Sequence, residues 1–318
     1  MPQQNRPRRS CLAVPGSNLR FLEKAQSLPA DQVFLDLEDA CAPLEKPGAR
    51  ARIVEALTTH DWGTKTRVVR INQVGSRYAF LDLLEVVRGA GAVLDCIMVP
   101  KVQNPGDIAF VDRALTQLEL LFELEPGRIG IEAQVEDAQG LMNSDAIAFS
   151  SPRLETLTYG PADFSAAMQL PSLTVADGSP DYPGDAFHYV LFKLAVSARA
   201  AGIQVVDGPY LAIRDVDGYR GAATKAAALG YDGKWCLHPD QIAPCNESFT
   251  PSQQQFDRAV KILDAYRHAT EVERRGAVML GDEMIDEASR KMATQFFLRG
   301  QAAGLSATPQ PEPAAAAS

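Results

Sequence analysis

The segment QVFLDLED, residues 32–39, combines the side chains of a buried strand with several carboxylates. The two-residue period of a β-strand places Asp36 and Glu38 on one face, with the other face carrying Val33, Leu35 and Leu37. We expect the apolar face to pack against helices and the acidic face to point inward. Burying an unpaired carboxylate is costly, so the sequence must supply a compensating charge for the acidic face.

Similar short apolar runs recur along the chain, and each is followed by a segment with helical periodicity. The predicted strands are 11–16, 32–39, 66–72, 96–102, 129–137, 155–163, 203–209 and 233–239. The clearest helical segments between them are 46–59, 105–122, 185–202 and 215–230. Eight strand–helix repeats over this length predict an α/β fold of the (β/α)₈ TIM-barrel type. The alternative is an open doubly wound sheet, but the turn VPGSN after the first strand lacks its usual glycine-rich phosphate loop.

The pattern of residue types along the sequence divides the chain into three parts. We expect residues 10–250 to form the barrel and residues 251–301 to form a C-terminal helix and a small lid. Thr250 or Ser252 is predicted to cap the long helix. The low-complexity end, residues 302–318, is expected to be disordered.

Composition narrows the class of protein. The net charge of −9 argues against nucleic-acid binding, and no apolar stretch is long enough to cross a membrane. The N-terminal segment lacks the apolar region of a signal peptide. Five cysteines without C-x-x-C spacing indicate reduced thiols, no zinc site and a cytoplasmic location.

Polar residues follow almost every predicted strand, where a barrel enzyme builds its active site. They are Glu38, Asp39, Arg70, Asn72, Lys101, Glu136, Asp137, Asp163, Asp207 and His238. Each also has a structural interpretation: the aspartates can cap helices, His238 can anchor a turn, and Lys101 can pair with an acid. The collective pattern favours a functional rim.

Strand parity connects two of these positions. In TRVVRIN, residues 66–72, Arg70 and Asn72 share a face with Val68. We therefore expect Arg70 to neutralise carboxylates from the preceding strand.

Glu136 and Asp163 end neighbouring strands without thiolates or paired histidines nearby. A few hard oxygen ligands suit Mg²⁺, with Mn²⁺ as a substitute. A general acid–base pair of carboxylates is the alternative.

Seven ordered motifs resemble the HpcH/HpaI aldolase superfamily, and they are most similar to its citrate lyase β-subunit-like branch with malyl-CoA and β-methylmalyl-CoA lyases. They are LDLEDACAPLEKPGAR, VVRIN, IMVPK, VEDAQG, YGPADFSAAM, VDGPY and KWCLHPDQI. The resemblance implies a (β/α)₈ barrel with a C-terminal lid, assembled as a homotrimer or hexamer.

The resemblance also implies roles for residues of the rim. Glu136 and Asp163 would bind Mg²⁺, and Arg70 would contact the substrate. Glu38 and Asp39 would hold metal-bound waters and Arg70 in place.

Two further segments take roles from the resemblance. GDEMIDEAS nominates Asp286 as a residue that completes the neighbouring subunit's site. The loop PGSNLRFLEK, residues 15–24, would lie against coenzyme A with Lys24 near its phosphates. Malyl-CoA lyases often carry an arginine after PGS, where this chain has Asn18, and Arg20 is the candidate substitute.

The implied activity is cleavage of a 3-hydroxyacyl-CoA, such as malyl-CoA or β-methylmalyl-CoA, into glyoxylate and acetyl-CoA or propionyl-CoA, or the reverse condensation. The partners are then a CoA thioester and a 2-oxo acid. A citramalyl-CoA lyase, a malyl-CoA thioesterase and a citrate lyase β-type subunit of a larger complex are the alternatives.

Overall fold

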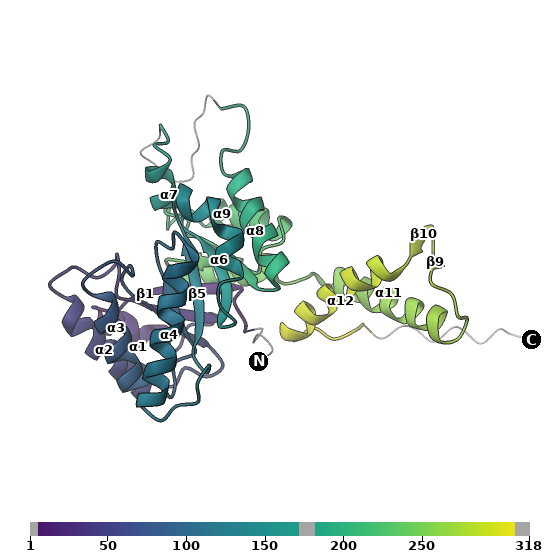
Figure 1. Ribbon diagram of the computed structural model, residues 1–318. Helices are drawn as coiled ribbons and strands as arrows, with labels where there is room; N and C mark the ends of the chain where they lie inside the picture. The colour runs from purple at the N-terminus through teal and green to yellow at the C-terminus, as the bar shows by residue number, and fades with distance from the viewer. Residues whose placement is uncertain (1–5, 172–181, 309–318) are drawn as a thin grey trace, which may run out of the picture. The chain divides into compact units, whose positions relative to one another are not determined.

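The computed structural model describes residues 6–171 and 182–308 of the 318-residue chain. The chain divides into two compact units, residues 1–249 and 250–318 (Figure 1). The strands of the first unit are β1 Ser10–Pro15, β2 Gln32–Asp36, β3 Thr66–Arg70, β4 Cys96–Val99, β5 Gly130–Val135, β6 Leu154–Tyr159, β7 Gln204–Asp207 and β8 Gly233–Cys236. Its helices are α1 Leu19–Ala25, α2 Lys46–Thr59, α3 Ala79–Ala90, α4 Pro105–Leu121, α5 Ala138–Met142, α6 Ser144–Ala148, α7 Pro161–Ala167, α8 His188–Ala201, α9 Val216–Ala228, the 3₁₀ turn η1 Pro239–Gln241 and α10 Ile242–Phe249.

The eight strands form a closed barrel in which each pairs in parallel with the next, and β1 closes the ring against β8. The predicted (β/α)₈ fold is therefore confirmed. Helices lie around the strands throughout this unit (Figure 1). This topology brings the carboxyl ends of all eight strands to one rim.

The barrel separates its side chains as strand parity predicts. Val33, Leu35 and Leu37 of the β2 segment belong to the large core between strands and helices. The inward side chains form a second, smaller cluster, which consists of Cys11, Phe34, Val68, Cys96, Met98, Val206 and Trp235. The barrel interior is thus packed below the rim.

Arg8 closes the opposite end of the barrel with a side chain that is fully buried. Its guanidinium donates to Gln32 at 3.0 Å and Glu132 at 2.8 Å, and to Gln204 and Glu155 at 2.5 Å each. Burial opposes the charge, but the neighbouring groups together, with Glu132 foremost, outweigh this effect and raise the pKa of Arg8. A buried cation bound to several acceptors therefore replaces apolar packing at this end.

Strands β3 and β6 end before the positions expected from the sequence, and this corrects two placements. β3 stops at Arg70, so Asn72 does not share the inward face of Arg70. Its backbone and side-chain N–H groups donate to Asp82 of α3, at 2.9 and 2.6 Å. Asp163 does not end β6; it lies in the first turn of α7, because Pro161 lacks a backbone N–H and begins that helix.

The second unit contains α11 Gln253–Glu271, the hairpin β9 Val278–Leu280 and β10 Glu283–Ile285, and α12 Glu287–Ala302. Ser252, one of two predicted caps, begins α11 with a capping box. The rings of Phe256 and Phe297 stack at 5.5 Å, and Gly300 leaves room for Phe256 where a Cβ would collide with it. Of the predicted C-terminal tail, residues 309–318 lie outside the described residues.

All five cysteines are free and buried. Across residues 6–171 and 182–308, no helix is long and apolar enough to cross a membrane.

Candidate active site

Arg70 points into the barrel from the end of β3, where Asp36 of β2 holds it through two hydrogen bonds. Nε donates to Oδ1 and Nη2 donates to Oδ2, both at 2.7 Å. The predicted neutralisation of a β2 carboxylate by Arg70 is confirmed. Asp36 also accepts the backbone N–H groups of Glu38 at 2.8 Å and Ala40 at 3.0 Å. It therefore fixes both the guanidinium and the turn after β2.

The guanidinium of Arg70 rests on an aromatic floor. Its Cζ lies 5.8 Å from the ring centroid of Phe34 and 5.2 Å from that of Trp235. Burial opposes the charge, but Asp36, Glu38 and Glu136 together outweigh this effect and raise the pKa of Arg70. Bonds to Asp36 and, at 3.3 Å, to Gln134 use three of its five N–H donors. Two terminal N–H groups remain to face Glu38 or an incoming anion.

Glu38 and Asp39 meet Lys101 at the rim. The ammonium of Lys101 contacts Glu38 Oε1 and lies 3.4 Å from Asp39 Oδ1 and 3.8 Å from Asp163 Oδ1. Burial raises the pKa of Glu38, and the neighbouring Arg70 only partly offsets this. Lys101 therefore links acids from two segments, the turn after β2 and the first turn of α7, which matches the structural interpretation of this residue.

The backbone of Lys101 is in the left-handed region, with φ of 53°. This conformation costs a non-glycine residue about 1–3 kcal/mol, so surrounding contacts must hold it. The backbone N–H of Lys101 donates to Glu136 Oε1 at 2.7 Å. The unusual backbone thus serves to aim an N–H group at a site carboxylate.

Glu136 follows β5 and is the most buried of the acids at this rim that were nominated from the sequence, with 2% of its surface exposed. Its Oε2 accepts from Gln134 Nε2 at 2.7 Å. Burial and the charge of Asp163 raise the pKa of Glu136 to about 8. Arg70 therefore offsets only part of the burial of Glu136 and the negative charge of Asp163.

The negative charge around Glu136, which Arg70 offsets only in part, bears on whether Glu136 and Asp163 suit a divalent cation. A hard cation beside Glu136 and Asp163 would supply the missing positive charge. Among the described residues, no three His, Cys, Asp or Glu side chains gather to enclose a metal. Mg²⁺ commonly binds through one or two carboxylates and keeps several waters. The pair therefore fits Mg²⁺ and does not fit a closed zinc-type cage.

Lys46 supports the acidic turn from behind. Its buried ammonium donates to the carbonyls of Leu37 and Glu38, both at 2.7 Å, and to Asn72 Oδ1 at 2.6 Å. All three ammonium hydrogens are used. Together Lys46 and Asp36 determine where the turn of Glu38 lies.

Three other rim residues take structural contacts in this structure. Asp137 caps α5 by accepting from the backbone of Gly140 at 2.7 Å. Asp207 pairs with the buried ammonium of Lys234 at 2.5 Å, so it is an ion-pair partner and not a helix cap. His238 Nδ1 accepts the backbone N–H of Asp240 at 3.3 Å and so caps η1.

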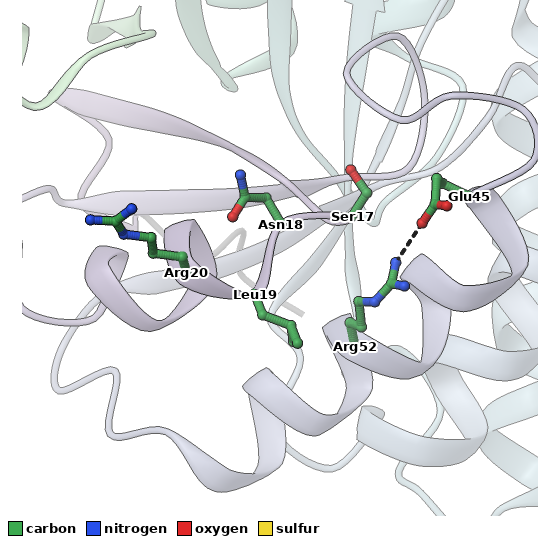
Figure 2. Close-up of a pocket in the computed structure, with 6 residues that line it drawn as sticks. All are labelled: Ser17, Asn18, Leu19, Arg20, Glu45 and Arg52. Carbon is green, nitrogen blue, oxygen red and sulfur yellow. Dashed lines mark hydrogen bonds and ion pairs between the residues drawn. The ribbon is translucent and has the colours of Figure 1, made fainter.

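A shallow cavity of about 440 Å³ lies beside the loop after β1 (Figure 2). Its lining residues are Ser17, Asn18, Leu19, Arg20, Glu45 and Arg52. Figure 2 shows Arg20 and Arg52 on either side of the loop, with Arg52 paired to Glu45 at 3.0 Å. Lys24 lies one helical turn beyond Arg20 on α1 and is exposed, but it does not line this cavity.

Asp286 lies in the second unit and caps α12. Its Oδ1 accepts the backbone N–H of Ser289 at 3.0 Å, and this bond lowers the pKa of Asp286. The side chain is therefore a well-bonded carboxylate within its own unit.

Four contributors to this region were not nominated from the sequence as site residues: Asp36, Lys46, Gln134 and Arg52. Parity does reveal Gln134, because it lies two residues before Glu136 and must face the same way. Lys46 and Arg52 lie on α2. The groups that their side chains contact depend on how α2 packs on the barrel, which the sequence alone does not show.

Comparison with known proteins identifies the class. Residues 9–239 match the HpcH/HpaI aldolase/citrate lyase family, and the chain belongs to this family. An L-malyl-CoA/β-methylmalyl-CoA lyase from Cereibacter sphaeroides is 36% identical over 92% of this chain and 94% of its own length. A (3S)-malyl-CoA thioesterase from the same species is 33% identical over 95% and 98%.

Among solved structures, CitE from Mycobacterium tuberculosis in complex with magnesium, acetoacetate and coenzyme A superposes with a TM-score of 0.71. It is 29% identical and covers 92% of this chain and 97% of its own. The resemblance read from the motifs is confirmed at the level of the family.

Proposed function

We propose that this protein is a divalent-metal-dependent lyase that cleaves malyl-CoA or β-methylmalyl-CoA to glyoxylate and acetyl-CoA or propionyl-CoA, or catalyses the reverse condensation. One observation carries the proposal: the buried guanidinium of Arg70 and the charge-deficient pair Glu136 and Asp163 share the carboxyl rim of the barrel. The similarity to malyl-CoA lyases extends over nearly the whole chain.

Glu136 and Asp163 would hold Mg²⁺ or Mn²⁺, because carboxylate and water oxygens suit both cations. When bound, such a cation lowers the pKa of a substrate hydroxyl and polarises the carbonyl oxygen that develops from it. Glu38 and Asp39 would accept hydrogen bonds from waters at this position. Lys101 keeps these acids together by contacting all but Glu136 through its ammonium.

Arg70 would bind the developing negative charge. Its position is fixed by Asp36, so little reorganisation is needed when charge appears on the substrate. Its two remaining N–H groups suit a carboxylate or an enolate oxygen. The aromatic floor of Phe34 and Trp235 excludes water from beneath the guanidinium.

The cavity beside the β1 loop would take the phosphates of coenzyme A. Arg20 and Arg52 supply two guanidinium groups, and Lys24 adds a cation one turn further along α1. A phosphate would compete with Glu45 for Arg52, which is possible because that ion pair is solvent-exposed. The loop can approach Asp36 closely because Gly16 carries no Cβ there.

The second unit would act as a lid in a homotrimer or hexamer. We propose that Asp286 of one subunit completes the site of its neighbour and handles the substrate proton. Closure by such a lid would exclude water from a reactive enolate.

The decisive experiment offers the purified protein a panel of malyl-CoA, β-methylmalyl-CoA and citramalyl-CoA with Mg²⁺. We expect glyoxylate to appear from the first two substrates, trapped as its phenylhydrazone. Glyoxylate should form without release of free thiol, because the CoA remains esterified. Release of pyruvate alone would identify a citramalyl-CoA lyase and overturn the proposal.

A thioesterase is the second candidate, because the relative named (3S)-malyl-CoA thioesterase aligns with 95% of this chain. It would release free CoA and malate without glyoxylate. A thiol reagent run beside the glyoxylate assay separates the two activities. A lack of all turnover by the isolated chain, with recovery in a complex, would instead favour a citrate lyase β-type subunit.

A further inference from the structure

We propose that Gln134 is a positioning residue that connects Arg70 to Glu136 and holds Glu136 ready for the divalent cation. This inference rests on the proposed metal site. Gln134 lies on β5 with 2% of its surface exposed. Its Oε1 accepts from Arg70 Nη1 at 3.3 Å, and its Nε2 donates to Glu136 Oε2 at 2.7 Å.

The two neighbours determine which way the amide faces. A guanidinium has only donors, so the oxygen of Gln134 must face Arg70. The NH₂ group then has to face Glu136, where it requires an accepting carboxylate oxygen. Because Asp36 holds Arg70 through two bonds, the orientation of Gln134 is itself fixed.

Both oxygens of Glu136 are consequently aligned by rigid donors. Gln134 donates to Oε2, and the backbone N–H of Lys101 donates to Oε1, each at 2.7 Å. Each oxygen keeps a lone pair, because a carboxylate offers about four acceptor positions. Such outer hydrogen bonds orient metal-binding carboxylates, and their loss typically weakens metal affinity about 10- to 100-fold.

Gly160, which follows β6, leaves room for the side chains of Gln134 and Glu136 because it has no Cβ. A Cβ at this position would lie 2.5 Å from both Cβ and Oε2 of Glu136 and 3.0 Å from Gln134 Nε2. Its φ of −110° is accessible to alanine. Substituting Gly160 therefore displaces Glu136 by steric contact and tests whether the position of Glu136 governs cation binding, without removing a hydrogen-bonding group.

The chain contains a matched control at the other end of the barrel. Gln32 accepts from Arg8 Nε at 3.0 Å and donates to Glu132 Oε2 at 3.2 Å, which is the same arginine–glutamine–glutamate arrangement. Gln32 is likewise buried, and it lies at the amino end of β2, away from the rim. A variant at Gln32 has the structural consequences of losing such a bridge without touching the metal site.

The experiment measures Mn²⁺ binding to the metal-stripped, full-length protein by electron paramagnetic resonance, without substrate. Parent, Gln134→Met, Gly160→Ala and Gln32→Met are compared, with thermal unfolding as a check of folding. We expect Kd for Mn²⁺ to rise at least about tenfold in Gln134→Met and Gly160→Ala. Gln32→Met should lower Tm but leave Kd within about twofold of the parent.

Parent-like Kd in a folded Gln134→Met protein would overturn the role of Gln134 and leave the metal site standing. Parent-like Kd in a folded Gly160→Ala protein would overturn the premise that the position of Glu136 governs cation binding. An equal rise of Kd in Gln32→Met would also overturn it, because the effect would then be a general loss of stability. If the parent itself binds no Mn²⁺, the proposed metal site fails together with this inference.

Discussion

Arg70 and Asp36 are joined in a two-bond ion pair with both N–O distances at 2.7 Å, inside a barrel and at adjacent strand ends. Removing either partner would leave an uncompensated buried charge. The ion pair between Asp36 and Arg70 therefore explains how a carboxylate on the inward face of β2 can be buried. The remaining donors of Arg70 are available to the substrate because the pair holds them in place.

Arg70→Lys should reduce kcat/KM more than tenfold, a loss of about 1.4 kcal/mol or more in transition-state stabilisation. Lysine keeps the charge but cannot contact Asp36, Gln134 and a substrate oxygen in one plane. Steady-state kinetics with malyl-CoA measures the effect.

The matched control for this prediction is Arg50→Lys. Arg50 is equally buried and bonds Asp82 at 2.7 Å, but between α2 and α3. We expect it to lower Tm and retain kcat/KM within about threefold. A decrease of less than tenfold in Arg70→Lys would assign Arg70 a supporting role only.

Glu136 should make the metal-free protein less stable as pH rises. Its carboxyl has a pKa of about 8 when folded, against a reference value of 4.5. Between these values the folded state binds a proton that the unfolded state has lost, so stability is present below about pH 4.5 and is lost as pH rises toward 8.

Glu136→Gln removes this dependence. In the presence of a chelator, its stability relative to the parent should increase by more than about 1 kcal/mol between pH 5 and pH 8. Urea unfolding at several pH values measures the difference. Parallel pH dependence in the two proteins would contradict the raised pKa, and Asp137→Asn serves as a neighbouring control.

Asp286→Ala and Glu136→Ala should each be inactive alone, while mixed oligomers of the two should regain activity. Some sites in the mixture would combine an intact barrel with an intact neighbouring lid. Co-expression with two tags isolates the mixed oligomer for assay.

The control mixture is Glu136→Ala with Asp163→Ala, in which every subunit has a defective barrel. It should remain inactive in the same doubly tagged form. Absence of recovery in a verified oligomer of Asp286→Ala and Glu136→Ala would rule out a site shared between subunits.

Arg52→Met should raise KM for the CoA thioester about fivefold or more while changing kcat little. A phosphate contact remote from the reacting carbon contributes mainly to uniform binding. In the condensation direction, KM for glyoxylate should not change. Arg113→Met, an exposed arginine on α4, is the control, and equal effects of both variants would indicate only the loss of surface charge.

The barrel and the Arg70 contact were predictable because both follow from local rules. Two-residue periodicity assigned the faces of β2, and adjacent strands in a barrel had to bring Arg70 beside Asp36. The same reasoning failed at Asn72, because periodicity holds only while the strand continues. Asp163 was displaced for a similar reason, since Pro161 starts a helix.

Other features depend on packing that no short window of sequence contains. Lys46 contacts the turn after β2 from a helix. The role of Gln134 follows only from its position between Arg70 and Glu136. Because its amide carries no charge, Gln134 does not stand out in a sequence as a candidate site residue. Which subunit Asp286 serves is a question of assembly, and it remains a prediction.

Arg8 has a consequence for the order in which the protein matures. It is synthesised almost first, yet its partners Glu132, Glu155 and Gln204 lie 124, 147 and 196 residues later in the chain. Contacts of such long range form slowly. During translation the amino-terminal end must therefore wait, with its arginine in water, until most of the barrel has left the ribosome. A fusion partner placed directly before Arg8 would be carried through that delay, and a short flexible spacer should improve the yield of folded protein.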